Sequence, residues 1–333
     1  MEVAAQFSTG HDDYVHDVQY DYYGKRIATA SSDQRIKIWE QNDEGDWVCT
    51  ANWNAHHGPV WRVAWAHPEY GQVLASCSFD QNVYIWEEQE GVEFVDGAKK
   101  AEVRWQRKAH LADSGESVND LKFAPRHMGL KLATASADGF VRFYEAEDVM
   151  NLSVWSPQPP FEADSEGASC LSWCQSRFDP QMIVVGFSGK KDDGVHAKVW
   201  GYQAESRKWA VVAKLGGPEY SHAHTQPVHD VSWAPTVGRS YHLIATASKD
   251  RSLIIWRLTG FGDDAAPELM ARLEEHKSEV WRVEWNITGS VLASSGDDGI
   301  VRLWKQSLGG EWKCATEVLS DGSAPRGGGG GGG

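Results

Sequence analysis

Five stretches of six residues share one arrangement of apolar and polar positions. Apolar residues occupy the first and fourth positions, a polar residue or an alanine follows, and an aromatic ring ends the stretch. They are VHDVQY (15–20), VWRVAW (60–65), VNDLKF (118–123), VHDVSW (228–233) and VWRVEW (280–285). Short runs of this kind, rich in β-branched and aromatic residues, predict β-strands with one buried face.

A longer pattern follows each of these stretches and contains two more predicted strands. In every copy an aromatic residue stands six positions after an Asp, and the Asp lies in a short turn. The copies are IATASSDQRIKIW (27–39), LASCSFDQNVYIW (74–86), LATASADGFVRFY (132–144), IATASKDRSLIIW (244–256) and LASSGDDGIVRLW (292–304).

A sixth, degenerate copy lies between the third and the last two, with an expanded KKDDG turn. Its strands are predicted at 168–173, 182–189 and 195–200. Fourth strands are predicted after most of the aromatic positions, at 46–53, 102–108, 208–215, 269–275 and 310–319. Four-stranded sheets in tandem predict an all-β propeller of six blades over residues 1–320.

The recurring polar residues predict one hydrogen-bond network in each blade. The turn Asp accepts backbone N–H groups, and a strand Ser or Thr receives the indole N–H of the buried Trp. A His four residues before the first strand can link the hydroxyl to the Asp. The predicted network residues are His11, Thr29, Asp33, Trp39, His56, Ser76, Asp80, Trp86, Thr134, Asp138, Tyr144, Trp200, His224, Thr246, Asp250, Trp256, His276, Ser294, Asp298 and Trp304.

Composition narrows the possible functions. The chain of 333 residues has 32 Lys and Arg against 47 Asp and Glu, a formal net charge of −15, which disfavours direct nucleic-acid binding. A basic stretch at 98–110 is interpreted as a solvated outer strand and loop. Five cysteines without a C-x-x-C pair indicate a reduced, intracellular protein. Neither a membrane span nor a signal peptide is expected.

No catalytic, metal or cofactor site is expected from the motifs. The His and Asp residues recur at equal spacing in successive blades, whereas an active site is a single convergent constellation. His222, His224 and His229 have a spacing that could hold a metal, but His224 already belongs to the blade network. The segment GFSGKK (186–191) lacks the spacing of a phosphate-binding loop.

These residues resemble the WD-repeat family, whose blades carry the same His, Ser or Thr, Asp and Trp set. The resemblance covers residues 1 to about 320 in six ordered copies. The departures are Tyr144 in place of Trp, the absence of a correctly spaced His before the third blade, Gly296 in place of Ser, and the irregular fourth blade.

Segments 60–80, 123–155 and 280–305 resemble, within that family, the Seh nucleoporins of the Y-shaped nuclear pore scaffold. This resemblance implies an open propeller, completed in trans by a blade from a helical solenoid nucleoporin, and contacts with other Y-complex nucleoporins. It implies localisation at the nuclear envelope. It also implies a shared role in the second GATOR complex, in amino-acid signalling at lysosomal or vacuolar membranes. The COPII coat propeller of the Sec-thirteen type is the alternative.

The N-terminal stretch EVAAQF (2–7) supports an open ring independently. If 310–319 is the fourth strand of blade 6, this stretch is left without a sheet. Unpaired strands and exposed blade faces are sites where another chain can add. The alternative is that EVAAQF closes blade 6 in the ordinary way. The residues predicted to contact the partner are Val3, Ala5, Phe7, Val15, Val18, Val280 and Val283.

A different class of function is a propeller that reads a peptide at its central channel. Arg62 and Arg282, which replace the Asp of VHDV, are the candidates for such a site. The Gly-rich tail 321–333 has too little apolar surface to fold and is predicted to be disordered.

Overall fold

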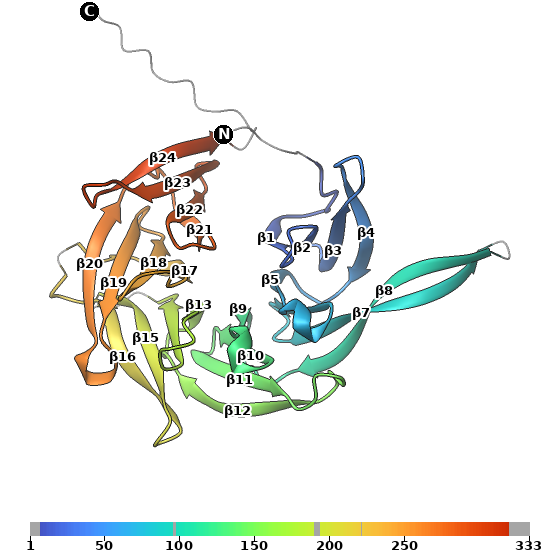
Figure 1. Cartoon of the computed structure of the whole chain (residues 1–333), viewed down its shortest axis with the longest axis horizontal. Coiled ribbons are helices and arrows are strands. Elements are labelled where there is room, and N and C mark those ends of the chain that lie inside the picture. Colours follow the sequence, from blue (N-terminus) through green and yellow to red (C-terminus); the bar gives the residue numbers. More distant parts are fainter. Residues whose placement is uncertain (1–6, 96–97, 190–193, 221, 320–333) are drawn as a thin grey trace, which may run out of the picture. The chain divides into compact units, whose positions relative to one another are not determined.

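In the computed structural model, residues 7–95, 98–189, 194–220 and 222–319 are described, and their secondary structure is almost entirely β (Figure 1). These residues form 24 strands in six four-stranded antiparallel sheets. Three 3-10 helices of one turn each lie in connections, at Pro68–Tyr70, Arg126–Met128 and Gly262–Asp264. Within this part of the chain no helix has the length and apolar character needed to cross a membrane.

The described chain divides into two compact units, residues 7–171 and residues 172–319. The N-terminal unit holds three sheets, blades 1 to 3. Blade 1 is β1 (Val15–Tyr20), β2 (Arg26–Ser31), β3 (Arg35–Gln41) and β4 (Trp47–Asn54); blade 2 is β5 (Val60–Trp65), β6 (Val73–Ser78), β7 (Val83–Val95) and β8 (Ala98–Leu111); blade 3 is β9 (Val118–Phe123), β10 (Lys131–Ser136), β11 (Phe140–Ala146) and β12 (Trp155–Glu162).

The C-terminal unit holds blades 4 to 6, and the division between the units falls within β13. Blade 4 is β13 (Ala168–Trp173), β14 (Met182–Phe187), β15 (Val195–Gln203) and β16 (Lys208–Gly216); blade 5 is β17 (Val228–Trp233), β18 (His242–Ser248), β19 (Leu253–Thr259) and β20 (Ala266–Leu273); blade 6 is β21 (Val280–Trp285), β22 (Val291–Gly296), β23 (Ile300–Gln306) and β24 (Trp312–Leu319).

The expected strand pattern is confirmed in each copy, including the degenerate fourth one. Blade 6 has its own fourth strand at Trp312–Leu319, as the sequence predicted, so its sheet is complete without residues 2–7. Residues 1–6 and the tail from 320 lie outside the described residues, and so does the expanded turn at 190–193.

The hydrophobic core lies between successive sheets. The face of blade 1 that carries Ala28 and Ile36 packs against Val60 and Leu74 of blade 2. Equivalent clusters join blade 2 to blade 3 and blade 5 to blade 6. Within each unit the facing sides of these neighbouring sheets are therefore buried against one another.

One hairpin is much longer than the repeat requires. Strands β7 and β8 pair from Val83↔Leu111 to Val95↔Ala98 and project away from the rest of blade 2 (Figure 1). The sequence predicted only a short outer strand at 102–108, because the WD pattern ends at Trp86 and gives no signal for the extension.

Candidate functional site

In blade 1 the predicted network is a continuous chain of hydrogen bonds. The indole N–H of Trp39 donates to Thr29 Oγ1 at 3.2 Å, and Thr29 Oγ1 lies 2.8 Å from His11 Nε2. The other ring nitrogen, His11 Nδ1, lies 2.7 Å from Asp33 Oδ2. The second oxygen of Asp33 accepts the N–H of Arg35 at 2.9 Å, so the carboxylate also closes the turn between β2 and β3.

The same four-residue network is present in blades 2, 5 and 6. From Trp to hydroxyl the distances are 2.9, 3.2 and 2.8 Å, and from hydroxyl to His Nε2 they are 2.8, 2.8 and 2.7 Å. His Nδ1 lies 3.1 Å from the Asp carboxylate in each. The members are His56, Ser76, Asp80 and Trp86; His224, Thr246, Asp250 and Trp256; and His276, Ser294, Asp298 and Trp304.

Electrostatics fix the protons in this network. Burial lowers the pKa of His56, so its ring is neutral at pH 7. Burial alone would raise the pKa of Asp80, but the hydrogen bond from His56 and the N–H groups of His57 and Asn82 hold it far below its usual range. A neutral His therefore donates from Nδ1 to an ionised Asp and accepts the Ser proton at Nε2. Every group in the network has a partner, as a buried polar network requires.

Blade 3 uses a different arrangement. Its turn residue Asp138 is held by Arg142, whose two terminal nitrogens donate at 3.1 and 2.7 Å. Thr134 Oγ1 makes no hydrogen bond with the described residues, because no His reaches it. Nearby His110 instead lies 2.7 Å from Asn82 of blade 2. Tyr144 occupies the Trp position, where burial and a hydrogen bond to Asp113 raise its pKa.

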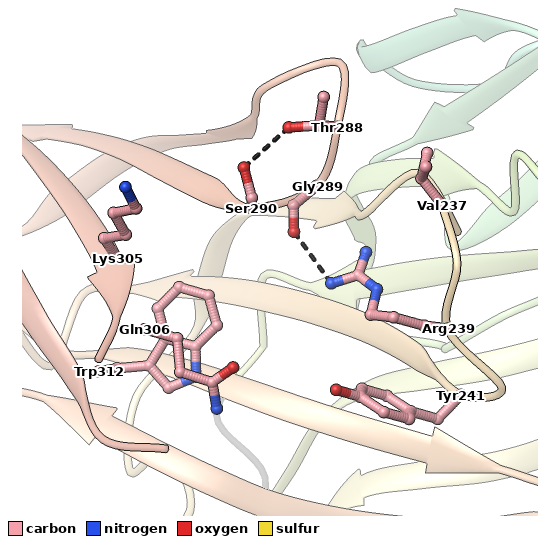
Figure 2. Close-up of a pocket in the computed structure, with 9 residues that line it drawn as sticks. All are labelled: Val237, Arg239, Tyr241, Thr288, Gly289, Ser290, Lys305, Gln306 and Trp312. Carbon is pink, nitrogen blue, oxygen red and sulfur yellow. Dashed lines mark hydrogen bonds between the residues drawn. The ribbon is translucent and has the colours of Figure 1, made fainter. Parts of the chain in front are cut away.

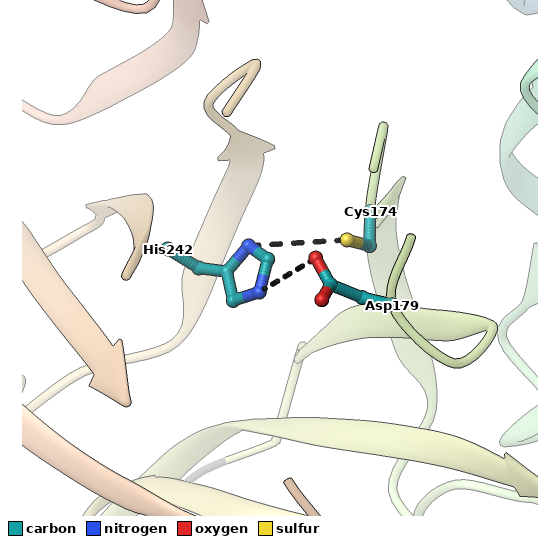
Figure 3. Close-up of side chains that lie close together, drawn as sticks. All are labelled: Cys174, Asp179 and His242. Atoms are coloured by element: carbon teal, nitrogen blue, oxygen red, sulfur yellow. Dashed lines mark hydrogen bonds and ion pairs between the residues drawn. The ribbon is translucent and has the colours of Figure 1, made fainter. Parts of the chain in front are cut away.

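In blade 4, Trp200 lies on β15 opposite Ile183 and Val211, and the sequence has Gly194 rather than Asp six positions before it. A different buried cluster links Cys174 to blade 5 (Figure 3). His242 Nδ1 lies 3.9 Å from Cys174 Sγ, and His242 Nε2 lies 3.4 Å from an oxygen of Asp179.

The cluster could offer three ligand atoms to a metal ion, but two of them are protonated or already hydrogen-bonded in the structure. Burial raises the pKa of Cys174 to about 12, so the thiol keeps its proton at pH 7. His242 Nδ1 already accepts the indole N–H of Trp233 at 3.3 Å. The three histidines with metal-like spacing are not brought together, since His224 is in its blade network and His229 stacks on Trp281 at 4.1 Å.

Sequence reasoning missed a set of contacts between successive first strands. The Asp of the VHDV pattern accepts a backbone N–H of the next blade. Asp17 Oδ2 accepts from Val63 at 3.1 Å, Asp120 Oδ2 accepts from Leu171 at 2.8 Å, and Asp230 Oδ2 accepts from Val283 at 3.0 Å. The signal in the sequence was a charged Asp at a position within a strand where a buried side chain is expected.

Arg62, the candidate for a peptide-reading channel, is a member of this internal network. Its Nε lies 3.3 Å from Asp120 Oδ1 and its terminal nitrogen 3.8 Å from Asp17 Oδ1, and all three side chains are buried. The guanidinium is therefore committed to joining three blades of the N-terminal unit. Arg282 is half-buried on β21.

Four of the seven residues expected to contact a partner lie on first strands, Val15 and Val18 on β1 and Val280 and Val283 on β21. On β1, Val15 and Val18 are 37% and 51% exposed, whereas their counterparts Val60 and Val63 of blade 2 are 0% and 1% exposed. The residues at these two positions are buried in the first strands of all five other blades, namely Val60, Val63, Val118, Leu121, Ala168, Leu171, Val228, Val231, Val280 and Val283.

The expectation for Val280 and Val283 was therefore wrong. Both are buried in a core cluster with Leu253 and Ile255 of blade 5. The error has a physical cause: the first-strand valines face the preceding blade, so only those of blade 1 lack a preceding blade in the chain. On β23 of blade 6, Val301 is 41% exposed, whereas its counterpart Leu253 of blade 5 is fully buried.

Phe7 packs on Trp39 and Trp47, with ring centroids 5.0 and 6.0 Å apart. The other two N-terminal residues of the prediction, Val3 and Ala5, lie outside the described residues. In the basic stretch 98–110, Lys108 pairs with Glu87 at 2.9 Å and Arg107 lies over the ring of Tyr84.

Fold and repeated network define the chain as a six-bladed β-propeller of the WD-repeat class. The WD domain, G-beta repeat family matches residues 4–40, 47–87, 217–257 and 267–305. These segments correspond to blades 1, 2, 5 and 6, the blades in which the four-residue network is complete.

Comparison with curated proteins gives the particular family. Nucleoporin SEH1 of Homo sapiens is 45% identical over 337 residues, which cover 98% of this chain and 91% of that protein. Nucleoporin SEH1 of Danio rerio is 45% identical, covering 98% and 90%, and that of Xenopus tropicalis is 46% identical, covering 97% and 90%. The chain belongs to the nucleoporin SEH1 family.

Proposed function

We propose that the chain is a non-catalytic scaffold subunit of the nuclear pore Y-complex, located at the nuclear envelope. Its partner is a helical solenoid nucleoporin, which donates a blade to the exposed face of blade 1. Family membership supports the pore assignment, and the exposure of Val15 and Val18 supports the mode of binding. The same face would serve a GATOR-complex subunit at lysosomal or vacuolar membranes.

The observation that carries this proposal is the contrast between blade 1 and its neighbours. The two apolar residues at the first and fourth positions of the first strand are buried in blades 2 to 6 and exposed in blade 1. A donated sheet would restore the contact that Val60 and Val63 make with Ala28 and Ala30 inside the chain. Burying a valine side chain contributes about 1.5–3 kcal/mol, so two of them form an effective anchor.

Two alternative functions have less support. Arg62, proposed as a reader of peptides, is buried between two carboxylates and has no free edge for a ligand. The relatives described above are nucleoporins rather than COPII coat proteins.

The test is co-purification with the solenoid nucleoporin of the same species after the substitution Val18→Asp. The matched control is Val48→Asp, because Val48 is 48% exposed on β4, the outer strand of the same blade. Both variants should melt like the wild type when purified alone, since both side chains face solvent.

The expected result is loss of the partner from Val18→Asp and retention by Val48→Asp, with the nuclear-rim signal of a tagged chain lost in parallel. Retention of the partner at wild-type affinity by Val18→Asp would overturn the docking face. A wild-type chain absent from the nuclear rim would overturn the pore assignment itself. Loss of a GATOR subunit from Val18→Asp as well would support one shared face, and its retention would contradict the sharing.

A further inference from the structure

A cavity of about 280 Å³ lies in the C-terminal unit where blades 5 and 6 meet (Figure 2). Three segments line it: the connection from β17 to β18, the turn from β21 to β22, and the hairpin of β23 and β24. Arg239 and Tyr241 come from the first, Ser290 from the second, and Lys305, Gln306 and Trp312 from the third.

The guanidinium of Arg239 is fixed in this cavity without a counter-ion. Its terminal nitrogens donate to the carbonyl oxygens of Gly289 at 2.9 Å and Pro235 at 2.6 Å (Figure 2). Its Nε is buried and makes no hydrogen bond with the described residues, and no described carboxylate forms an ion pair with it. Two backbone carbonyls therefore hold the group in place while its charge stays unneutralised.

Two other partly buried arginines, Arg26 and Arg302, differ from Arg239 in this respect. Burial lowers the pKa of Arg239, whereas Arg26 and Arg302 have raised values because nearby carboxylates outweigh the same burial effect. Arg26 lies 2.6 Å from Glu88, and Arg302 lies 2.6 Å from Asp298. In Arg239 the cost of desolvation is offset by two backbone carbonyls and by no carboxylate of the described residues.

Additional donors surround the same space. Trp312 is only 9% exposed, yet its indole N–H has no hydrogen-bond partner among the described residues. Lys305 is exposed and has no ion pair in the described part of the chain. Tyr241 contributes a hydroxyl, and its ring is packed under Arg257, whose guanidinium carbon lies 4.4 Å from the ring centroid.

No Asp or Glu lines the cavity, although the chain carries a net charge of −15. Two cations in one carboxylate-free cavity, with the buried and unpartnered indole N–H of Trp312 in its wall, form a site complementary to an anion. The cavity is far larger than the 10–15 Å³ or so that one water needs by the same measure.

We propose that this cavity binds a phosphomonoester group carried on a side chain of a protein segment. A phosphomonoester has a charge of about −1.5 to −2 and three acceptor oxygens, which matches two cations and an indole donor. A carboxylate, with one charge and two oxygens, would leave one of the cations unneutralised. Trp312 and Tyr241 supply apolar walls for the side chain that presents the group. Val18 plays no part in this site, so the two proposals are tested separately.

Binding is measured by fluorescence anisotropy with the full chain and a labelled pentapeptide that has a central phosphoserine between glycines. The same peptide with serine, and with glutamate, tests charge and geometry. Inorganic phosphate, added as a competitor, tests whether the free ion occupies the site equally well. The phosphopeptide should bind about tenfold more tightly than either other peptide, because a charge-assisted hydrogen bond contributes about 1.5–3 kcal/mol.

Two variants locate the site. Lys305→Glu and Trp312→Phe should each weaken phosphopeptide binding, by about tenfold for the charge reversal. The matched control is Lys313→Glu on the same hairpin, since Lys313 lies outside the cavity and pairs with Glu311 at 2.8 Å. Because Lys305 faces solvent, its variant should keep the wild-type melting temperature, even if the more buried Trp312 variant is less stable.

Equal binding of the three peptides would overturn the proposal, as would equal affinities for Lys305→Glu and Lys313→Glu. Competition by inorganic phosphate at concentrations similar to those of the phosphopeptide would overturn the assignment of a protein segment as the ligand and would favour the free ion. Weak competition by the free ion, with loss of peptide binding in Lys305→Glu, supports the proposal as stated.

Discussion

Replacing Arg62 by Met should destabilise the N-terminal unit strongly. Arg62 lies between the buried carboxylates of Asp17 and Asp120, at 3.8 and 3.3 Å, and methionine keeps much of its volume while removing the charge. Removing one partner of a buried ion pair costs about 3–5 kcal/mol, because the remaining charge is left uncompensated. Backbone N–H groups still contact both carboxylates, so we expect a loss near the lower limit, about 3 kcal/mol.

The measurement is urea and thermal unfolding followed by circular dichroism. For a unit of this size, such a loss lowers the melting temperature by about 6–12 °C. The control is Arg35→Met, because among the described residues the Arg35 side chain makes only an exposed hydrogen bond, to Asn52 at 3.3 Å, and its effect should stay within about 0.5 kcal/mol.

A double variant separates charge from packing. Asp17→Asn keeps an oxygen that can accept the N–H of Val63 and removes one of the two uncompensated charges. In the Arg62→Met background it should therefore restore part of the lost stability, although it destabilises the wild type. A loss below about 1 kcal/mol for Arg62→Met, or strictly additive effects in the double variant, would refute this account of the network.

Three further outcomes are expected. Burial, assisted by a nearby guanidinium, lowers the pKa of His276. The unfolded chain therefore binds a proton more readily than the folded chain, and stability falls as pH drops through about 6.5. In His276→Gln, urea denaturation should show a smaller loss of stability between pH 7 and 5 than in the wild type, and an equal loss would contradict this sign. Gly139→Asn should lower the melting temperature, since a Cβ there would collide with backbone atoms, whereas Gly24→Asn, also at positive φ but in open space, should be nearly neutral. Native Cys174 should resist iodoacetamide while exposed Cys49 reacts, as mass spectrometry of the peptides will show; rapid labelling of Cys174 would refute its burial.

The sequence predicted the sheets well because local chemistry determines them. An Asp six residues before an aromatic ring requires a tight turn between two strands of matching length, and the register Ile27↔Trp39 follows from that turn. The four-residue network could be anticipated for the same reason, since its members recur at constant spacing. The fourth strand of blade 6 followed from counting strands in each repeat.

Features that depend on contacts between blades could not be predicted from local sequence patterns. Spacing alone does not say which face of a first strand packs on the preceding blade, and so Val280 was assigned to a partner although it is buried. The ion pairs of Arg62 join residues 45 or more positions apart along the chain, and no local pattern records them. The cavity around Arg239 likewise arises from three segments that meet only in the folded unit.

The composition of each sheet from one uninterrupted stretch has a consequence for the order of folding during synthesis. In the described chain, β1 to β4 end at Asn54, and each later blade is likewise complete before the next one begins. A nascent chain can thus close one sheet at a time as it leaves the ribosome, and none has to wait for the last residues to arrive. The apolar face of each finished sheet can then pack against the next sheet as soon as that sheet forms. Aggregation-prone apolar surface is therefore exposed only briefly at the growing end of the chain.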